Sequence, residues 1–183
     1  MHVQGNNSEV SLRQLLDILC ASHLLFKLKH HLIPKHPTQY RRASSTWKHD
    51  TRKFGPLNAL NNNTEDAWKS AQSEESDPLA YFEIDFHRPV HVNELRIQFQ
   101  GGFAGMDCIV YQSCGESVDQ TTDWEECEDL FIDPIDSNEV QTFESEADDA
   151  TSDKCSALRI EFGRSTDFYG RIVIYSLEVW GTE

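Results

Sequence analysis

The chain has 183 residues, 38% of them hydrophobic, which suffices for one hydrophobic core and an additional segment. Its 31 acidic and 16 basic residues give a net charge of −15 at pH 7. Such a body repels phosphate backbones and anionic lipid surfaces, and no apolar run approaches the roughly 20 residues that cross a bilayer. We therefore expect a protein partner with a basic surface, and neither direct nucleic-acid binding nor membrane insertion.

The first 45 residues form a basic, His-rich extension. Leucines recur at helical spacing from about residue 11 to residue 33, and Pro34 follows them. We predict a helix over about 11–33, or a disordered arm, outside a folded domain at 46–183. We expect a protein of the nucleus or cytoplasm. Because the arm is basic, amphipathic and poor in acids, mitochondrial import stays open as an alternative.

In the remainder of the chain, apolar and polar residues alternate with the two-residue period of β-strands. Four stretches alternate apolar and polar residues or are rich in β-branched and aromatic residues: YFEIDF, HVNELRIQF, LRIEF and RIVIYSLEVWG. Loops rich in Asn, Gly, Asp, Ser and Pro separate them. The pattern predicts an all-β protein, an antiparallel β-sandwich or jelly roll of about eight short strands.

Catalytic and metal-binding motifs are missing from the sequence. It contains no nucleophile elbow, Walker loop or HExxH pair, so we expect a protein that is not an enzyme. The five cysteines are odd in number and none is spaced as CxxC. This favours free thiols over a disulfide framework or a zinc site.

The order of landmarks resembles that of discoidin domains, also called coagulation-factor type C domains, which are galactose-binding-like jelly rolls. Gln100-Gly101 stands where these domains have Gln-Gly, and Trp68-Lys69-Ser70 stands on their Trp-x-Ser. The resemblance implies that Trp68 belongs to the core.

A more specific resemblance is to the nuclear receptor-associated protein family. Four motifs carry it: TRKFG (Thr51–Gly55), IQFQGGF (Ile97–Phe103), QTF (Gln141–Phe143) and TDFYGRIVIY (Thr166–Tyr175). It covers about residues 46–183. It implies an intracellular, non-catalytic partner that represses transactivation by an orphan nuclear receptor.

No cofactor is expected, although related carbohydrate-binding modules carry calcium in the loop before the conserved Trp. Here Asn61 replaces the family's Asp, Asp66 replaces its Thr, and Ser176 replaces a Glu of the last strand. Tight calcium sites depend on carboxylates. Two ligand positions have therefore lost a carboxylate and Asp66 restores one, so calcium stays an open alternative.

Two glycine-containing loops hold the candidate binding residues: Gln100, Gly101, Gly102, Phe103, Asp167, Phe168, Tyr169 and Arg171. In one interpretation the glycines only allow tight turns and Asp167 pairs with Arg171. In the other, these residues form a recognition patch, because aromatic residues beside an arginine are typical interface anchors. The loop aromatics would also suit a sugar, so a carbohydrate-binding module is an alternative function.

A long acidic stretch separates the two loops. Glu116–Asp153 contains fifteen acidic residues and no Lys or Arg. It is either a solvated insertion or a negative surface for a basic partner. A nuclear receptor's DNA-binding domain is such a partner, and we expect a monomeric protein that blocks its contact with DNA.

Overall fold

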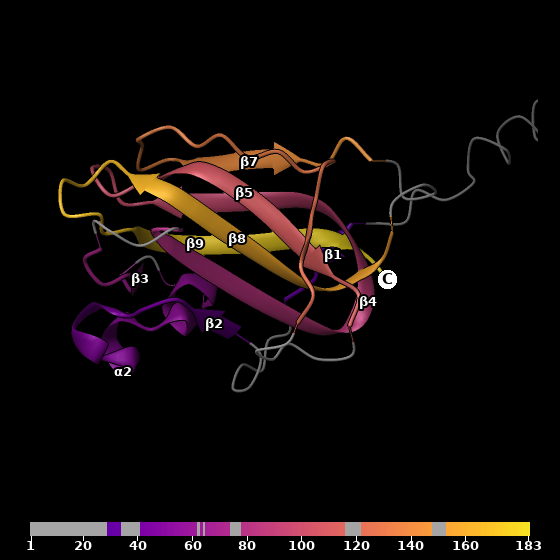
Figure 1. The fold of residues 1–183 in the computed structure, drawn as a ribbon, viewed down its shortest axis with the longest axis horizontal. Coiled ribbons are helices and arrows are strands. Elements are labelled where there is room, and N and C mark those ends of the chain that lie inside the picture. The colour runs from indigo at the N-terminus through magenta and orange to yellow at the C-terminus, as the bar shows by residue number, and fades with distance from the viewer. Residues whose placement is uncertain are drawn as a thin grey trace, which may run out of the picture.

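The computed structural model describes residues 29–33, 41–61, 63, 65–73, 78–115, 122–147 and 153–183. In these ranges the protein is an antiparallel β-sandwich (Figure 1), which confirms the predicted fold class. None of the helices in these ranges has the length and apolarity that a membrane span needs.

The strands are short except at the centre of the fold. They are β1 (His30–His31), β2 (Arg41–Ala43), β3 (Trp68–Lys69), β4 (Ala80–Phe99), β5 (Gly105–Ser113), β6 (Glu125–Glu126), β7 (Val140–Glu144), β8 (Cys155–Ser165) and β9 (Val173–Thr182). Three short helical segments lie between β2 and β3: η1 (Trp47–His49), α2 (Thr51–Phe54) and η2 (Pro56–Leu60).

Strand β4 belongs to both layers of the sandwich. Its first half pairs with β2 and β8, and its second half pairs with β9 and β7. Between the halves the register shifts after Asp85, and His87 has a φ of 53°. Figure 1 shows β4 turning at the end of the molecule that carries the C-terminus. A bulged corner of this kind lets one strand pass from one sheet to the other.

Aromatic side chains from both layers fill the core. Trp68 is fully buried, as expected, with its ring centroid 5.2 Å from Phe82 and 6.4 Å from Phe162. Part of the polar face of β4 is buried as well, including Glu83 and Asp85, and the Glu83 carboxylate accepts a 2.9 Å hydrogen bond from Arg159 Nε on the neighbouring strand. The alternation of apolar and polar residues thus predicts the strand, but it does not predict that polar side chains of the strand are also buried.

The predicted helix over about 11–33 is wrong at its C-terminal end. Residues 11–28 lie outside the described residues, but His30–His31 is a strand paired with β9. Leu32 and Ile33 are buried in the core. Pairing with a strand edge and burial of two large side chains outweigh the helical spacing of the leucines. Strands β1 and β2 both lie before residue 46, the predicted start of the folded domain.

Candidate functional site

The two glycine-containing loops meet at one end of the sandwich. Val173 N donates to Phe103 O over 3.1 Å, and Thr166 N donates to Ala104 O over 3.0 Å. Figure 1 shows the β8–β9 loop, in yellow, at the end opposite the C-terminus. We call residues 100–104 and 166–172 the tip. All eight candidate binding residues lie on it: Gln100, Gly101, Gly102, Phe103, Asp167, Phe168, Tyr169 and Arg171. Their role in binding stays a prediction.

The glycine pair of the tip is held by side chains from the acidic stretch. Gly101 N donates to Asn138 Oδ1 and Gly102 N donates to Asp136 Oδ1, each over 2.7 Å. Gly102 has a φ of 81°, in the left-handed region that favours glycine. Asn138 and Asp136 are not among the residues predicted from the sequence, because no local pattern links them to a loop more than thirty residues away.

An ion pair closes the β8–β9 loop. Arg171 Nε and Nη2 donate to the two oxygens of Asp167 over 2.8 and 3.0 Å. The Asp167 carboxylate also accepts the backbone N–H groups of Tyr169 and Arg171. These hydrogen bonds, that of the Arg171 side chain first, hold the pKa of Asp167 below its ordinary value of 3.8. The pairing predicted from the sequence is therefore present, and it makes the loop rigid.

The Arg171 guanidinium joins three segments of the chain. Its carbon lies 4.9 Å from the ring centroid of Phe103, 5.3 Å from that of Trp47 and 5.6 Å from that of Tyr169. Planar guanidinium groups stack favourably on aromatic faces. Trp47, in η1, is the member of this cluster that the sequence did not reveal. Arg171 is thus a structural centre of the tip and not an open cationic ligand.

The outermost aromatic side chains of the tip face solvent. Phe168 is 85% exposed and Tyr169 is 49% exposed. Their rings form an edge-to-face pair with centroids 5.2 Å apart. Exposed aromatic side chains on a rigid loop are suited to binding, because little conformational entropy is lost when they are covered.

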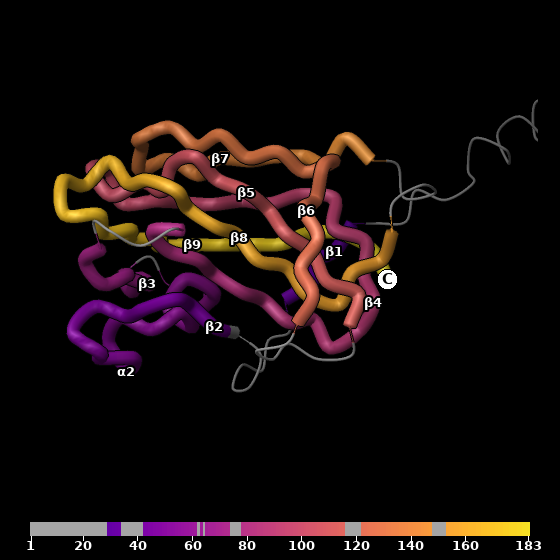
Figure 2. Tube along the Cα trace, viewed as in Figure 1, coloured from indigo at the N-terminus to yellow at the C-terminus, as the bar shows by residue number. Residues whose placement is uncertain are grey.

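The acidic stretch lies directly beside the tip. We call residues 122–147 the acidic flank. Figure 2 shows its orange trace running to the tip end of the sandwich and returning as β7. Its ten acidic residues are all exposed: Asp123, Glu125, Glu126, Glu128, Asp129, Asp133, Asp136, Glu139, Glu144 and Glu146. Among the described residues, none of these ten takes part in an ion pair, whereas glutamates of β4, β8 and β9 do.

Apolar side chains are interspersed with these carboxylates. Leu130 and Ile132 are buried and attach the flank to the core. Between them Phe131 is 73% exposed, and Ile135 and Val140 are exposed too. The flank is therefore an ordered surface that combines negative charge with apolar contacts, and not only a solvated loop.

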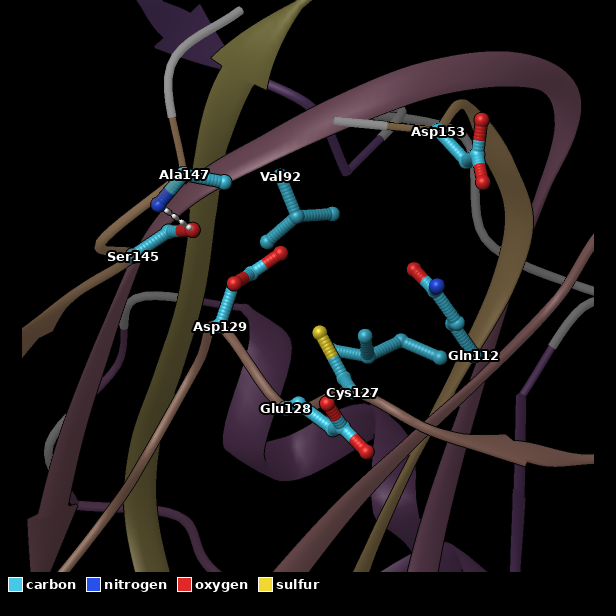
Figure 3. Close-up of a pocket in the computed structure, with 9 residues that line it drawn as sticks. Val92, Gln112, Cys127, Glu128, Asp129, Ser145, Ala147 and Asp153 are labelled. Atoms are coloured by element: carbon cyan, nitrogen blue, oxygen red, sulfur yellow. Dashed lines mark hydrogen bonds between the residues drawn. The ribbon is translucent and has the colours of Figure 1, made fainter. Parts of the chain in front are cut away.

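One small cavity lies between the flank and the sheets, near the end of β8 opposite the tip (Figure 3). Its volume is about 40 Å³, and its lining includes Val92, Cys127, Asp129 and Asp153. Small-molecule sites occupy roughly 300 Å³ or more, so this cavity has room for little more than water.

The described cysteines are free thiols: Cys108, Cys114, Cys127 and Cys155. Burial raises the pKa of Cys108 and of Cys155 to about 12. The thiolate is the reactive form, so these two residues are poor nucleophiles at neutral pH.

The described residues of the loop before Trp68, which are Asn61, Asn63, Glu65 and Asp66, do not fit calcium. The Asp66 carboxylate accepts hydrogen bonds from the amides of Asn61 and Asn63, over 3.2 and 2.9 Å. Across the described residues, no three His, Cys, Asp or Glu side chains are grouped as metal ligands. Calcium takes six to eight oxygens, and this loop turns two amide N–H groups toward its carboxylate.

Substituting Asp167→Asn tests the ion pair of the tip. We expect the free energy of unfolding to fall by about 2 kcal/mol at pH 7, because charge-assisted hydrogen bonds to Arg171 are lost. A carboxylate with a lowered folded-state pKa contributes stability above its unfolded pKa. The difference in unfolding free energy between the wild type and the variant should therefore shrink as the pH falls through the folded-state pKa of Asp167, which lies below 3.8.

Urea denaturation across this pH range measures the effect. Asp107→Asn is the control, because the Asp107–Arg164 pair is solvent-exposed and such pairs add little stability. Equal losses in the two variants would contradict a specific role for the Asp167 pair.

Curated relatives match most of the chain, and two of them illustrate the similarity. "Nuclear receptor 2C2-associated protein" of Danio rerio is 36% identical over 140 residues, which covers 76% of this chain and 89% of that protein. The Homo sapiens protein of the same name is 34% identical over 145 residues, covering 79% of this chain and 93% of that protein. No protein-family model matches the chain.

Solved structures with the same fold are more distant in sequence. Chitosan-binding module 1 of a Paenibacillus chitosanase/glucanase has a TM-score of 0.62 at 16% identity, covering 83% of this chain and 99% of that one. An F5/8 type C domain from Bacteroides fragilis has a TM-score of 0.58 at 11% identity, covering 78% and 91%. These similarities identify a discoidin-like sandwich, as the sequence landmarks predict.

Proposed function

The chain belongs to the nuclear receptor 2C2-associated protein family, and from this premise we propose that it is a non-catalytic module that binds a nuclear receptor. Its contact surface is the acidic flank together with the adjoining tip. The observation that carries this proposal is the set of ten exposed carboxylates in the flank, none of them ion-paired within the described residues.

A basic partner surface fits this arrangement. A receptor's DNA-binding domain has such a surface, because it must neutralise phosphates. Opposite charges accelerate and orient association, while buried apolar anchors slow dissociation. Phe131 of the flank and Phe168 of the tip supply exposed apolar anchors. Occupation of the domain by this module excludes DNA, and repression of transactivation then needs no chemistry.

A charge-neutralised flank tests the proposal. The variant Glu125→Gln, Glu126→Gln, Glu128→Gln, Asp129→Asn should bind the receptor's DNA-binding domain about tenfold more weakly or worse in calorimetric titration. Wild-type affinity should fall as salt rises, since contacts between exposed charges are screened. A DNA duplex containing the receptor's site should compete with the protein.

The control removes four exposed negative charges outside the flank and the tip, at Asp50, Glu65, Asp107 and Glu183. It should retain wild-type affinity. Equal weakening in both variants would show a general effect of net charge. An affinity independent of salt, or a ternary complex with DNA, would rule out the proposed competition.

Carbohydrate binding is the second candidate function. The exposed pair Phe168 and Tyr169 favours it, as do the sugar-binding names of the fold neighbours. Sugar sites also need polar groups that converge on the hydroxyls. Here the Asp167 carboxylate already accepts four hydrogen bonds from its own loop. We therefore favour the protein partner, and a glycan array with wild type and Phe168→Ala separates the candidates.

The family name and the free thiols support action in the nucleus or cytoplasm. Import into mitochondria through the basic N-terminal arm is the alternative. Imaging of the protein with a fluorescent tag at its C-terminus decides between these locations, because that tag leaves the arm unblocked.

A further inference from the structure

Ion pairing divides the cations of this protein into two groups. Of the twelve Lys and Arg residues whose side chains are described, six pair with carboxylates: Lys29, Arg88, Arg96, Arg159, Arg164 and Arg171. The other six form no ion pair within the described part of the chain: Arg42, Lys48, Arg52, Lys53, Lys69 and Lys154. In a chain with 31 acidic residues, unpaired cations that gather in one place require an explanation.

Three of the unpaired cations gather around two aromatic rings, and a fourth, Arg52, precedes one of them in α2. The ammonium groups of Lys53 and Lys69 each lie 5.3 Å from the ring centroid of Phe54. That of Lys48 lies 5.8 Å from the ring centroid of Trp47. We call these side chains, with Arg52 of α2, the basic surface: Trp47, Lys48, Arg52, Lys53, Phe54 and Lys69.

Hydrogen bonds attach this surface to the sandwich. Asp50 caps α2 by accepting from Lys53 N over 3.1 Å. The Asn58 amide donates to Lys53 O over 2.7 Å and to Ala67 O over 3.2 Å, which links α2 to the residue before β3. The lysines therefore stand at defined positions, and their binding to an anion does not require the backbone to become ordered first.

The backbone within the basic surface is strained. Lys48 and His49 have φ values of 55° and 57°, in a region that non-glycine residues rarely adopt. Such conformations persist only where the surroundings determine them, and they are common at functional sites. Here the neighbouring Trp47 ring is fixed against Arg171 of the tip.

We propose that the basic surface binds a short acidic segment of a protein partner. Carboxylates of the segment pair with the lysines and Arg52, and an apolar side chain of the segment covers Leu57. Leu57 follows Phe54 by three residues and is 39% exposed. Ammonium groups held over ring faces keep their outer side open to an anion.

A nucleic acid fits this surface less well. Proteins that bind single strands offer aromatic faces on which bases stack. Two ammonium groups already occupy positions over the Phe54 ring. The net charge of −15 also repels an extended polyanion. A short segment avoids most of this repulsion, since charges beyond a Debye length of about 8 Å are screened at physiological salt.

The inference goes beyond the proposed receptor contact, because the basic surface has the opposite charge and lies on another side of the tip. Trp47 contacts the tip through Arg171, whereas the acidic flank contacts it through Gly102. A partner that carries an acidic segment beside a basic surface would be held in a single orientation.

Titration of the ¹⁵N-labelled full chain with a synthetic peptide of alternating glutamate and leucine tests the proposal. At physiological salt we expect chemical-shift changes centred on the amides of Lys48, Lys53 and Lys69. The variant Lys53→Gln, Lys69→Gln should bind the peptide about tenfold more weakly. Both substituted side chains are at the surface, and thermal unfolding checks that the variant is folded.

The matched control is Arg42→Gln, Lys154→Gln, which removes two unpaired cations elsewhere and should bind as wild type does. Equal weakening in the control, or equal binding of a peptide with glutamine in place of glutamate, would overturn the proposal. So would a single-stranded oligonucleotide that displaces the peptide from the same amides. The flank-neutralised variant should retain peptide binding, so failure of the receptor contact is distinguishable from failure here.

Discussion

Substituting Leu32→Ala should lower the free energy of unfolding by about 3 kcal/mol, since removal of a buried leucine side chain leaves both lost burial and a cavity. Leu32 is 0% exposed, and its backbone N–H donates to Val179 O over 2.8 Å. Its carbonyl also accepts a hydrogen bond from Arg88. Urea denaturation followed by tryptophan fluorescence measures the change.

Leu57→Ala is the matched control, because this leucine is partly exposed and its truncation should cost much less. If Leu32→Ala unfolded at the same urea concentration as the wild type, residues 29–33 would not unfold together with the sandwich. A chain that starts at residue 46 should then be as stable as the full chain. We expect instead that this truncation is strongly destabilised, because it removes β1 and β2 together.

Substituting Gly170→Ala should also cost about 3 kcal/mol, for two additive reasons. Gly170 has a φ of 70°, which is unfavourable for alanine, and the new Cβ would lie 2.0 Å from Ser73 O. Ser73 belongs to the segment after β3, so relief of the clash must displace backbone. Urea denaturation measures the loss, and hydrogen exchange at residues 166–172 should show a less protected tip.

Gly102→Ala separates these two causes. Gly102 has a φ of 81°, but a Cβ there would meet no atom within 4 Å. We expect a loss of about 1 kcal/mol from the backbone conformation alone. Equal losses in the two variants would show that the β8–β9 loop moves away from Ser73 without cost, and that close packing does not fix the tip.

The tip is the element that relates the two charged surfaces to each other. Its glycine pair is bonded to the acidic flank through Asp136, and its Arg171 is stacked on Trp47 beside the basic surface. A tip loosened by Gly170→Ala would therefore weaken the binding of partners that contact both surfaces. Partners that contact only one surface should be affected less.

Much of the fold could be predicted from local sequence. The alternation in YFEIDF and HVNELRIQF indicates strands, because successive side chains of a strand face opposite sides. The ion pair of Asp167 and Arg171 is also local, since the two residues are four positions apart in one loop. The motifs around Gln100 and Trp68 indicate the jelly roll before any contact is known.

Other features depend on contacts between distant segments. Leu32 lies in a stretch with helical spacing, yet the sheet edge offered by β9 makes its neighbours a strand. Trp47 reaches the tip only because η1 packs against the β8–β9 loop. Propensity and periodicity describe neighbours in sequence and carry no information on such pairings.

Local sequence is enough to predict the class of fold, the family resemblance, the acidic character and the two glycine-containing loops, because each depends on composition or on residues a few positions apart. Contacts between distant segments bring these loops together and leave ten carboxylates of the flank without an ion pair within the described residues. The same contacts gather three lysines, which form no ion pair within the described residues, around Trp47 and Phe54. A surface charge can bind a partner only if folding leaves it without an intramolecular counter-charge, and the pairing of strands far apart in sequence decides which charged groups lie near one another.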